Sequence, residues 1–181
     1  MEQASQASDP RYPVGRFTAP ATITAGDRDR FIGEIEALPG QLRAALAGLN
    51  EQQLDTPYRD GGWTVRQVVH HFAESHMHSF LRFKLALTED NPTIKPYGEA
   101  ACAETPDAKT MPVLPSIELL DGLHQRWAVL LRWMSEQQYQ RTFQHPERGL
   151  MKLDVTLAIY AWHCRHHTRH ITALRERMGW V

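Results

Sequence analysis

Four long stretches of this 181-residue chain place apolar side chains at steps of three and four residues, which is the spacing of one face of an α-helix. We predict helices over residues 24–49, 64–87, 116–134 and 154–178, and we find no strand pattern of any length between them. Amphipathic helices bury their apolar faces against one another. The sequence therefore predicts an all-α fold, a four-helix bundle.

The ends of these helices carry recognisable signals. Thr24 and Thr64 each stand three residues before an Asp or Gln that can complete a capping box, so both mark helix starts. Gly179 follows the last apolar position and marks a helix end. Pro39 interrupts the first helix, and because proline lacks a backbone N–H we expect a kink or break near Leu38.

The connection between the second and third helices, residues 88–115, is the longest irregular segment and contains five prolines. A connection of this length without regular structure is usually functional or a long crossover. Residues 1–21 are polar or proline-containing, and we expect them to form an extended or loose N-terminal segment. Residues 22–181 are expected to form a single domain, because this length suffices for one sizeable core.

Composition narrows the class of protein. The formal net charge is −1, which argues against a general polyanion binder, and no basic run interleaved with aromatic residues suggests nucleic acid. No apolar stretch approaches the roughly 20 residues that span a membrane, and the N-terminus has no apolar signal-peptide core. Two cysteines are too few for a disulfide framework. We expect a cytoplasmic protein that binds neither nucleic acid nor membrane.

Histidines cluster in the last predicted helix. Four fall within eight residues: His163, His166, His167 and His170. Residues four apart share a helix face, and two such imidazoles can close on one metal ion with bonds of about 2.0–2.1 Å. A third ligand would come from the His70-His71 pair in the second helix. Spacing alone does not choose between the 163/167 and 166/170 pairs, and a histidine-rich, partly exposed helix face is the alternative.

The segment from Leu54 to Met77, LDTPYRDGGWTVRQVVHHFAESHM, resembles the second-helix signature of the DinB superfamily in its YfiT-like branch. Further matching segments are residues 12–15, 82–89, 95–97, 124–127, 160–167 and 177–180. Together they cover nearly the whole chain after its N-terminal tail. The resemblance implies a four-helix bundle of DinB/YfiT type with a long crossover connection. It also implies a homodimer that carries one divalent metal per chain on three histidines.

The resemblance assigns the ligands. In the family pattern the second-helix ligand is the second histidine of the His-His pair, which is His71 here. The last-helix ligands are the first histidine after Trp162 and the one four residues later, which are His163 and His167. Zn²⁺ is the expected ion because three protein ligands with an open position are typical of catalytic zinc, and Ni²⁺ could occupy the same imidazoles.

Polar residues near these histidines have open roles. Glu74, one turn after His71, is the expected catalytic base or a partner that orients the imidazole, with an exposed acid as the alternative. His70 is expected to face a neighbouring helix or solvent. His166 and His170 are expected at the surface rather than beside the ligands.

Three functions are open at this point. The family is described as metal-dependent hydrolases, in which an open metal position activates water for attack on a small-molecule substrate. Related members are thiol S-transferases, so the alternative is a bacillithiol-type transferase that conjugates a low-molecular-weight thiol to an electrophile. A non-enzymatic metal-binding stress-response protein would keep the ligands without an accessible cavity. Arg59, Arg82 and Tyr97 are candidates for binding an anionic substrate group.

Overall fold

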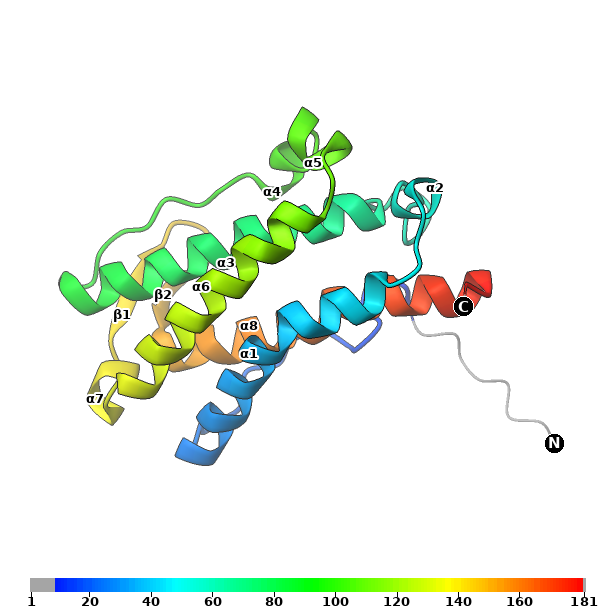
Figure 1. Ribbon diagram of the computed structural model, residues 1–181. Helices are drawn as coiled ribbons and strands as arrows, with labels where there is room; N and C mark the ends of the chain where they lie inside the picture. The colour runs from blue at the N-terminus through cyan, green and yellow to red at the C-terminus, as the bar shows by residue number, and fades with distance from the viewer. Residues whose placement is uncertain (1–8, 181) are drawn as a thin grey trace.

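Four long helices form a four-helix bundle in the computed structural model, which describes residues 9–180 (Figure 1). They are α1 (Ala25–Leu46), α3 (Val65–Thr88), α6 (Leu114–Trp133) and α8 (Leu153–Met178). Helix α1 packs against α8 and α6, and α3 packs against the same two helices. The predicted helices and the predicted four-helix bundle are therefore confirmed.

The capping signals act as expected. Thr24 accepts a hydrogen bond at its hydroxyl from the backbone N–H of Asp27 at 3.2 Å, and Thr64 accepts one from Gln67 at 3.1 Å. Both helices begin with a complete capping box. Helix α8 ends at Gly179, whose φ of 65° is a left-handed conformation that glycine adopts at little cost.

Of the two outcomes predicted at Pro39, a kink or a break, the structure has the kink, because α1 continues through Pro39 to Leu46. Figure 1 shows the blue and cyan parts of this helix running in different directions. Proline cannot donate to the carbonyl oxygen four residues earlier, which belongs to Ile35. That oxygen instead accepts a hydrogen bond from His124 Nδ1 on α6 at 2.6 Å. A tertiary donor therefore replaces the missing helical one.

Short elements fill the connections. They are α2 (Glu51–Leu54), α4 (Glu99–Cys102), α5 (Pro106–Thr110), α7 (Glu136–Tyr139), β1 (Thr142–His145) and β2 (Gly149–Lys152). The two strands pair antiparallel, with Thr142 opposite Lys152 and His145 opposite Gly149. The expectation of no strand is therefore wrong. Strands of four residues are too short to produce an alternation that stands out in a sequence.

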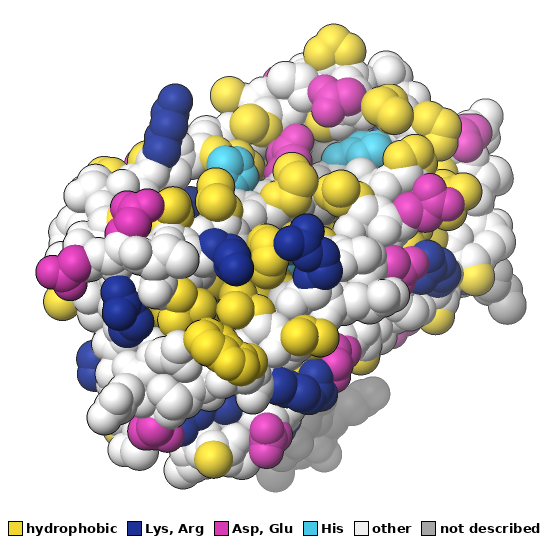
Figure 2. Space-filling view, turned by 60° about the vertical axis from the view of Figure 1, so that its left-hand side comes forward, with side chains coloured by type: hydrophobic (Ala, Val, Ile, Leu, Met, Phe, Trp, Pro, Cys, Tyr) yellow, Lys and Arg dark blue, Asp and Glu magenta, His cyan; other side chains and the backbone are white. Residues whose placement is uncertain are grey.

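The core lies between the long helices, and apolar side chains remain exposed at the edge between α3 and α6. Figure 2 shows hydrophobic side chains gathering on one face of the molecule, with Lys and Arg side chains among them. Val129 and Trp133 on α6 are 71% and 66% exposed. They border a shallow hollow that also touches Phe80 on α3.

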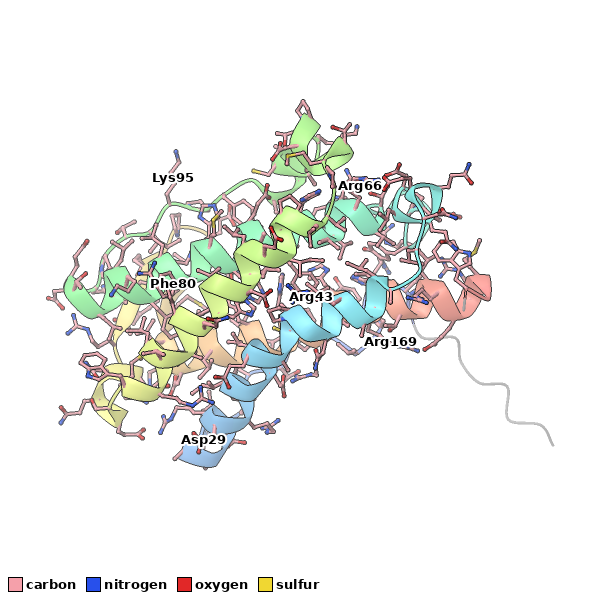
Figure 3. The ribbon with its side chains drawn as sticks, viewed as in Figure 1. Asp29, Arg43, Arg66, Phe80, Lys95 and Arg169 are labelled. Carbon is pink, nitrogen blue, oxygen red and sulfur yellow. The ribbon has the colours of Figure 1, made fainter. Side chains whose placement is uncertain are left out.

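One buried arginine attaches the 88–115 connection to the bundle. Arg66 on α3, labelled in Figure 3, has a side chain only 3% exposed. Its guanidinium donates to the Met111 carbonyl at 2.8 Å, to Asp55 at 2.7 Å and to Glu51 at 2.5 Å. These bonds hold the end of the connection beside the start of α3.

The expected extended segment, residues 1–21, falls partly outside the described residues. From residue 9 the chain forms turns and no helix or strand until Ala25. It packs on α8, because Trp162 Nε1 donates to the Gly15 carbonyl at 3.2 Å and Phe17 lies edge-on to Trp162. Among residues 9–180, no helix combines the length and apolarity needed to cross a bilayer.

Candidate metal centre

The three histidines expected as ligands converge from two helices. His71 lies on α3, and His163 and His167 lie one turn apart on α8. One ligand nitrogen from each lies within 4.8 Å of the others, and the Nε2 atoms of His71 and His163 are 3.1 Å apart. Two nitrogens bound tetrahedrally at 2.0–2.1 Å are about 3.3 Å apart. The residues present therefore fit one divalent ion.

The environment keeps these imidazoles neutral. Burial lowers the pKa of His163 and His167 well below 6.5, and neighbouring histidines lower both further. Burial, followed by His166, lowers the pKa of His71 to about 4. His163 and His167 keep part of their surface open to adjoining hollows, but their rings lie within the bundle. Neutral imidazoles offer the free lone pairs that metal binding needs.

The rings of His71 and His167 each contact a neighbour outside the set. His71 Nδ1 lies 3.0 Å from the hydroxyl of Tyr97, which the 88–115 connection supplies. His167 Nδ1 lies 3.2 Å from His170 Nδ1 on the same helix. Such contacts fix ring orientation in metal sites. The sequence indicated Tyr97 only as a candidate anion-binding group, and its contact with His71 was not predicted.

His166 and His170 are buried, at 6% and 3% exposed, so the expected surface position is wrong. His166 stacks on Trp162 and His170 stacks on Tyr58, with ring centroids 4.3 and 3.9 Å apart. Together with His167 they form a second group whose ligand nitrogens lie within 4.8 Å of one another. Both histidine pairs that spacing left open therefore point inward, and His167 belongs to both groups.

His70 and Glu74 lie outside these groups. His70 contacts Ser116 Oγ at 2.7 Å and the Met111 carbonyl at 3.2 Å, so it faces α6 and the 88–115 connection. Glu74 is half-buried, and burial followed by Asp107 raises the pKa of its carboxyl above the ordinary value. The partner of His71 Nδ1 is Tyr97, so the orienting role considered for Glu74 belongs to the tyrosine.

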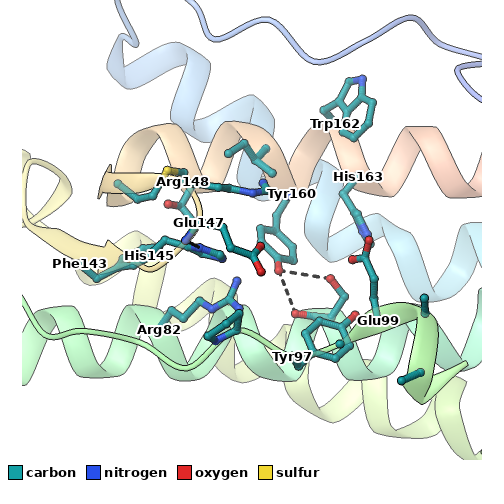
Figure 4. A pocket seen from close by; sticks show the side chains of 18 residues that line it. Arg82, Tyr97, Glu99, Phe143, His145, Glu147, Arg148, Tyr160, Trp162 and His163 are labelled. Atoms are coloured by element: carbon teal, nitrogen blue, oxygen red, sulfur yellow. Dashed lines mark hydrogen bonds between the residues drawn. The ribbon is translucent and has the colours of Figure 1, made fainter.

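A cavity of about 540 Å³ opens beside His163, between α3, α8, the β-hairpin and the 88–115 connection. Figure 4 shows His163 and Glu99 at one end, and Arg82 and Arg148 at the other with Glu147. Tyr160 lines the middle, where its hydroxyl bonds to the Ser75 side chain and backbone at 3.2 and 3.0 Å. One of the proposed ligands, His163, therefore borders a space large enough for a small molecule.

Comparison with known proteins shows relatives along almost the whole chain. A family model described as DinB superfamily matches residues 34–171. A Bacillus mycoides (strain KBAB4) protein named "Putative metal-dependent hydrolase" is 56% identical over 172 residues, which cover 95% of this chain and 99% of the relative. A protein of the same name from Bacillus cereus (strain B4264) is 56% identical over 173 residues, covering 96% and 99%.

Two solved structures are similar. YfiT from Bacillus subtilis, described as a probable metal-dependent hydrolase with an unusual four-helix bundle topology, superposes with a TM-score of 0.93 at 47% identity. The match covers 95% of this chain and 99% of YfiT. TT2238, a four-helix bundle protein, matches with a TM-score of 0.56 at 20% identity over 81% of this chain and 98% of its own, which shows the fold alone. The chain belongs to the DinB superfamily.

Proposed function

We propose that this protein is a metal-dependent hydrolase in which His71, His163 and His167 hold one divalent ion beside a small-molecule cavity. The observation that carries the proposal is the meeting of three neutral histidines from two helices, one of which, His163, lines a cavity of about 540 Å³. The names of the relatives support a hydrolytic, metal-dependent reaction. The substrate is proposed only as a small electrophilic molecule.

The donor set favours a catalytic rather than a structural metal. Structural zinc sites usually have four protein ligands, often including cysteine, whereas catalytic sites have three and an open position. A divalent ion bound here would supply Lewis acidity that lowers the pKa of a nucleophile at that position. We propose Zn²⁺ as the native ion, with Ni²⁺ as the alternative, because imidazoles bind both.

The protein's own groups would orient the ligands and bind the substrate. Burial raises the pKa of Tyr97, so its hydroxyl stays neutral, and its oxygen can accept a hydrogen bond from His71 Nδ1–H, which leaves the Nε2 lone pair for the ion. Arg82 and Arg148 would attract an anionic group at the far end of the cavity. Glu74 is the proposed general base, because it lies three residues after His71 on α3 and burial raises its pKa toward the range useful for proton transfer.

Thiol transfer is the second candidate. The cavity beside His163 is much larger than one water molecule and has room for a low-molecular-weight thiol of the bacillithiol type. A divalent ion on neutral ligands also stabilises a thiolate. A non-enzymatic metal-binding stress-response role is less favoured, because we expect such a protein to lack an accessible cavity. We further propose that the protein is cytoplasmic and forms a homodimer. Sedimentation analysis of the purified protein tests the dimer.

Metal analysis tests the site. Changing His71, His163 or His167 to Ala should each lower the bound metal per chain sharply, because two imidazoles hold a divalent ion much more weakly than three. His70→Ala is the matched control, because His70 is a buried histidine on α3 outside the site. Full metal occupancy in His163→Ala would contradict the ligand assignment.

An activity panel tests the reaction. Metal-loaded protein should hydrolyse an ester or amide, and the hydrolysis should disappear in His163→Ala. Conjugation of a low-molecular-weight thiol to an electrophile that disappears in the same variant would assign the protein as a transferase. Absence of both reactions across a broad panel would leave metal binding alone.

A further inference from the structure

A chain of buried imidazoles runs from His163 into the core of the bundle. His163 Nδ1 lies 3.2 Å from His76 Nε2 on α3, and His76 Nδ1 lies 2.9 Å from His124 Nε2 on α6. His124 Nδ1 lies 2.6 Å from the Ile35 carbonyl oxygen on α1. His76 and His124 are 0% and 1% exposed, and neither belongs to the groups that could hold a metal. The chain connects all four long helices.

The carbonyl end sets the direction of every hydrogen bond. A carbonyl oxygen only accepts, so His124 Nδ1 must carry the proton that it donates to Ile35. A neutral imidazole has a single N–H, so His124 Nε2 accepts from His76 Nδ1, and His76 Nε2 accepts from His163 Nδ1. His163 is thereby left with a bare Nε2, the atom that faces His71 Nε2 at 3.1 Å.

Two features of the core support this order. The Ile35 oxygen is available because the residue four positions later is Pro39, which has no N–H to donate. His124 is neutral at physiological pH, because burial lowers its pKa to about 4. The rings of Trp127 and Tyr160 pack around His76, with centroids 5.9 and 5.0 Å from the centroid of the imidazole.

We propose that His76 and His124 are positioning residues that hold His163 in the Nδ1–H tautomer and present its Nε2 lone pair to the ion of the proposed metal centre, on which this role depends. The chain ends on a carbonyl oxygen that cannot pass a proton onward, so it does not conduct protons to solvent. Its effect is to fix the ring and to raise the basicity of Nε2.

The metal-free wild-type protein gives the first test. Long-range ¹H–¹⁵N correlation spectra of the histidine rings report which nitrogen carries the proton. We expect His76, His124 and His163 all in the Nδ1–H form at pH 7. An Nε2–H form of His76 or His163 would overturn the proposal, and this measurement needs neither metal nor activity.

Paired substitutions give the second test. His124→Leu removes both hydrogen bonds of this ring, whereas His124→Gln keeps an N–H for Ile35 and a carbonyl for His76. Zn²⁺ affinity, measured by competition with a chromophoric chelator, should fall about 10- to 100-fold in His124→Leu. It should recover largely in His124→Gln. His70→Leu, a substitution at a buried histidine outside the chain, should keep the wild-type affinity.

The affinity results that would contradict the proposal lead to different conclusions. Wild-type affinity in His124→Leu beside a weakened His163→Ala would overturn the positioning role and leave the metal centre standing. Equal losses in His124→Leu and His124→Gln would also overturn it, because the role requires the donor and acceptor order rather than the imidazole itself. Wild-type affinity in His163→Ala would overturn the metal centre, and with it this role.

Discussion

Acid should unfold the metal-free protein well above the pH at which carboxylates titrate. Burial lowers the pKa of His71, His124 and His166 to about 4 and that of His170 to about 3. The same histidines in the unfolded chain titrate near 6.5. Below pH 6.5 the unfolded chain therefore binds more protons than the native state, and the free energy of unfolding falls as pH falls.

The size of the effect follows from these shifts. At pH 5, a histidine with an unfolded pKa near 6.5 and a folded pKa near 4 lowers the free energy of unfolding by about 2 kcal/mol. The four residues together contribute about 8 kcal/mol, and each binds about 0.9 extra protons on unfolding. Domains of this kind have total stabilities of about 5–15 kcal/mol. Most of the stability present at pH 7 should therefore be lost by pH 5.

Urea unfolding of chelator-treated protein, followed by circular dichroism between pH 7 and 5, measures this dependence. Near pH 5 the slope should correspond to at least three protons, or about 4–5 kcal/mol per pH unit. His124→Gln removes one buried titrating ring and should lower the slope by about one proton. Gln52→His adds a histidine at an exposed position and should leave it unchanged. A wild-type slope below one proton would refute the burial of neutral histidines.

Three other outcomes are expected. Arg66→Met should lower the free energy of unfolding by about 2–4 kcal/mol, because it removes three hydrogen bonds of a buried guanidinium. Glu51→Gln should lower the free energy of unfolding much less, because the Glu51 carboxylate is exposed. Metal-loaded protein should release its ion only as the pH approaches 4, because burial lowers the pKa of His71 to about 4 and protons then compete with the ion for this imidazole. Metal analysis after desalting checks this, and full retention at about pH 3 would contradict histidine ligation. Glu74→Gln should lower kcat without changing the metal content. Steady-state kinetics and metal analysis of the same variant measure both, and an unchanged kcat would exclude Glu74 as the base.

The long helices could be predicted because their information is local. Their apolar stripes repeat over many turns, and capping pairs such as Thr64 with Gln67 act within three residues. The β-hairpin was missed because each strand has only four residues, and alternate positions of the second one are exposed. At Pro39 the sequence could not decide between a kink and a break, since the donor that satisfies Ile35 comes from α6, far along the chain.

The candidate site was predictable only in part. The i, i+4 spacing places His163 beside His167, but nothing local in the sequence brings His71 to them, and the family resemblance supplied that step. The burial of His166 and His170 was missed because part of what covers them is distant in sequence. Trp162 lies on α8 itself, but Tyr58 comes from the loop before α3.

His76 shows how such a partner could be found from sequence. It lies five residues after His71, about 140° away around the helix, so a search for ligands on one face passes over it. Its position nevertheless continues the apolar stripe of α3, four residues after Phe72 and seven before Phe83. His124 does the same on α6, three residues before Trp127. A histidine on a stripe of buried aromatics needs a polar partner inside the core, and two of them on facing helices supply that partner to each other.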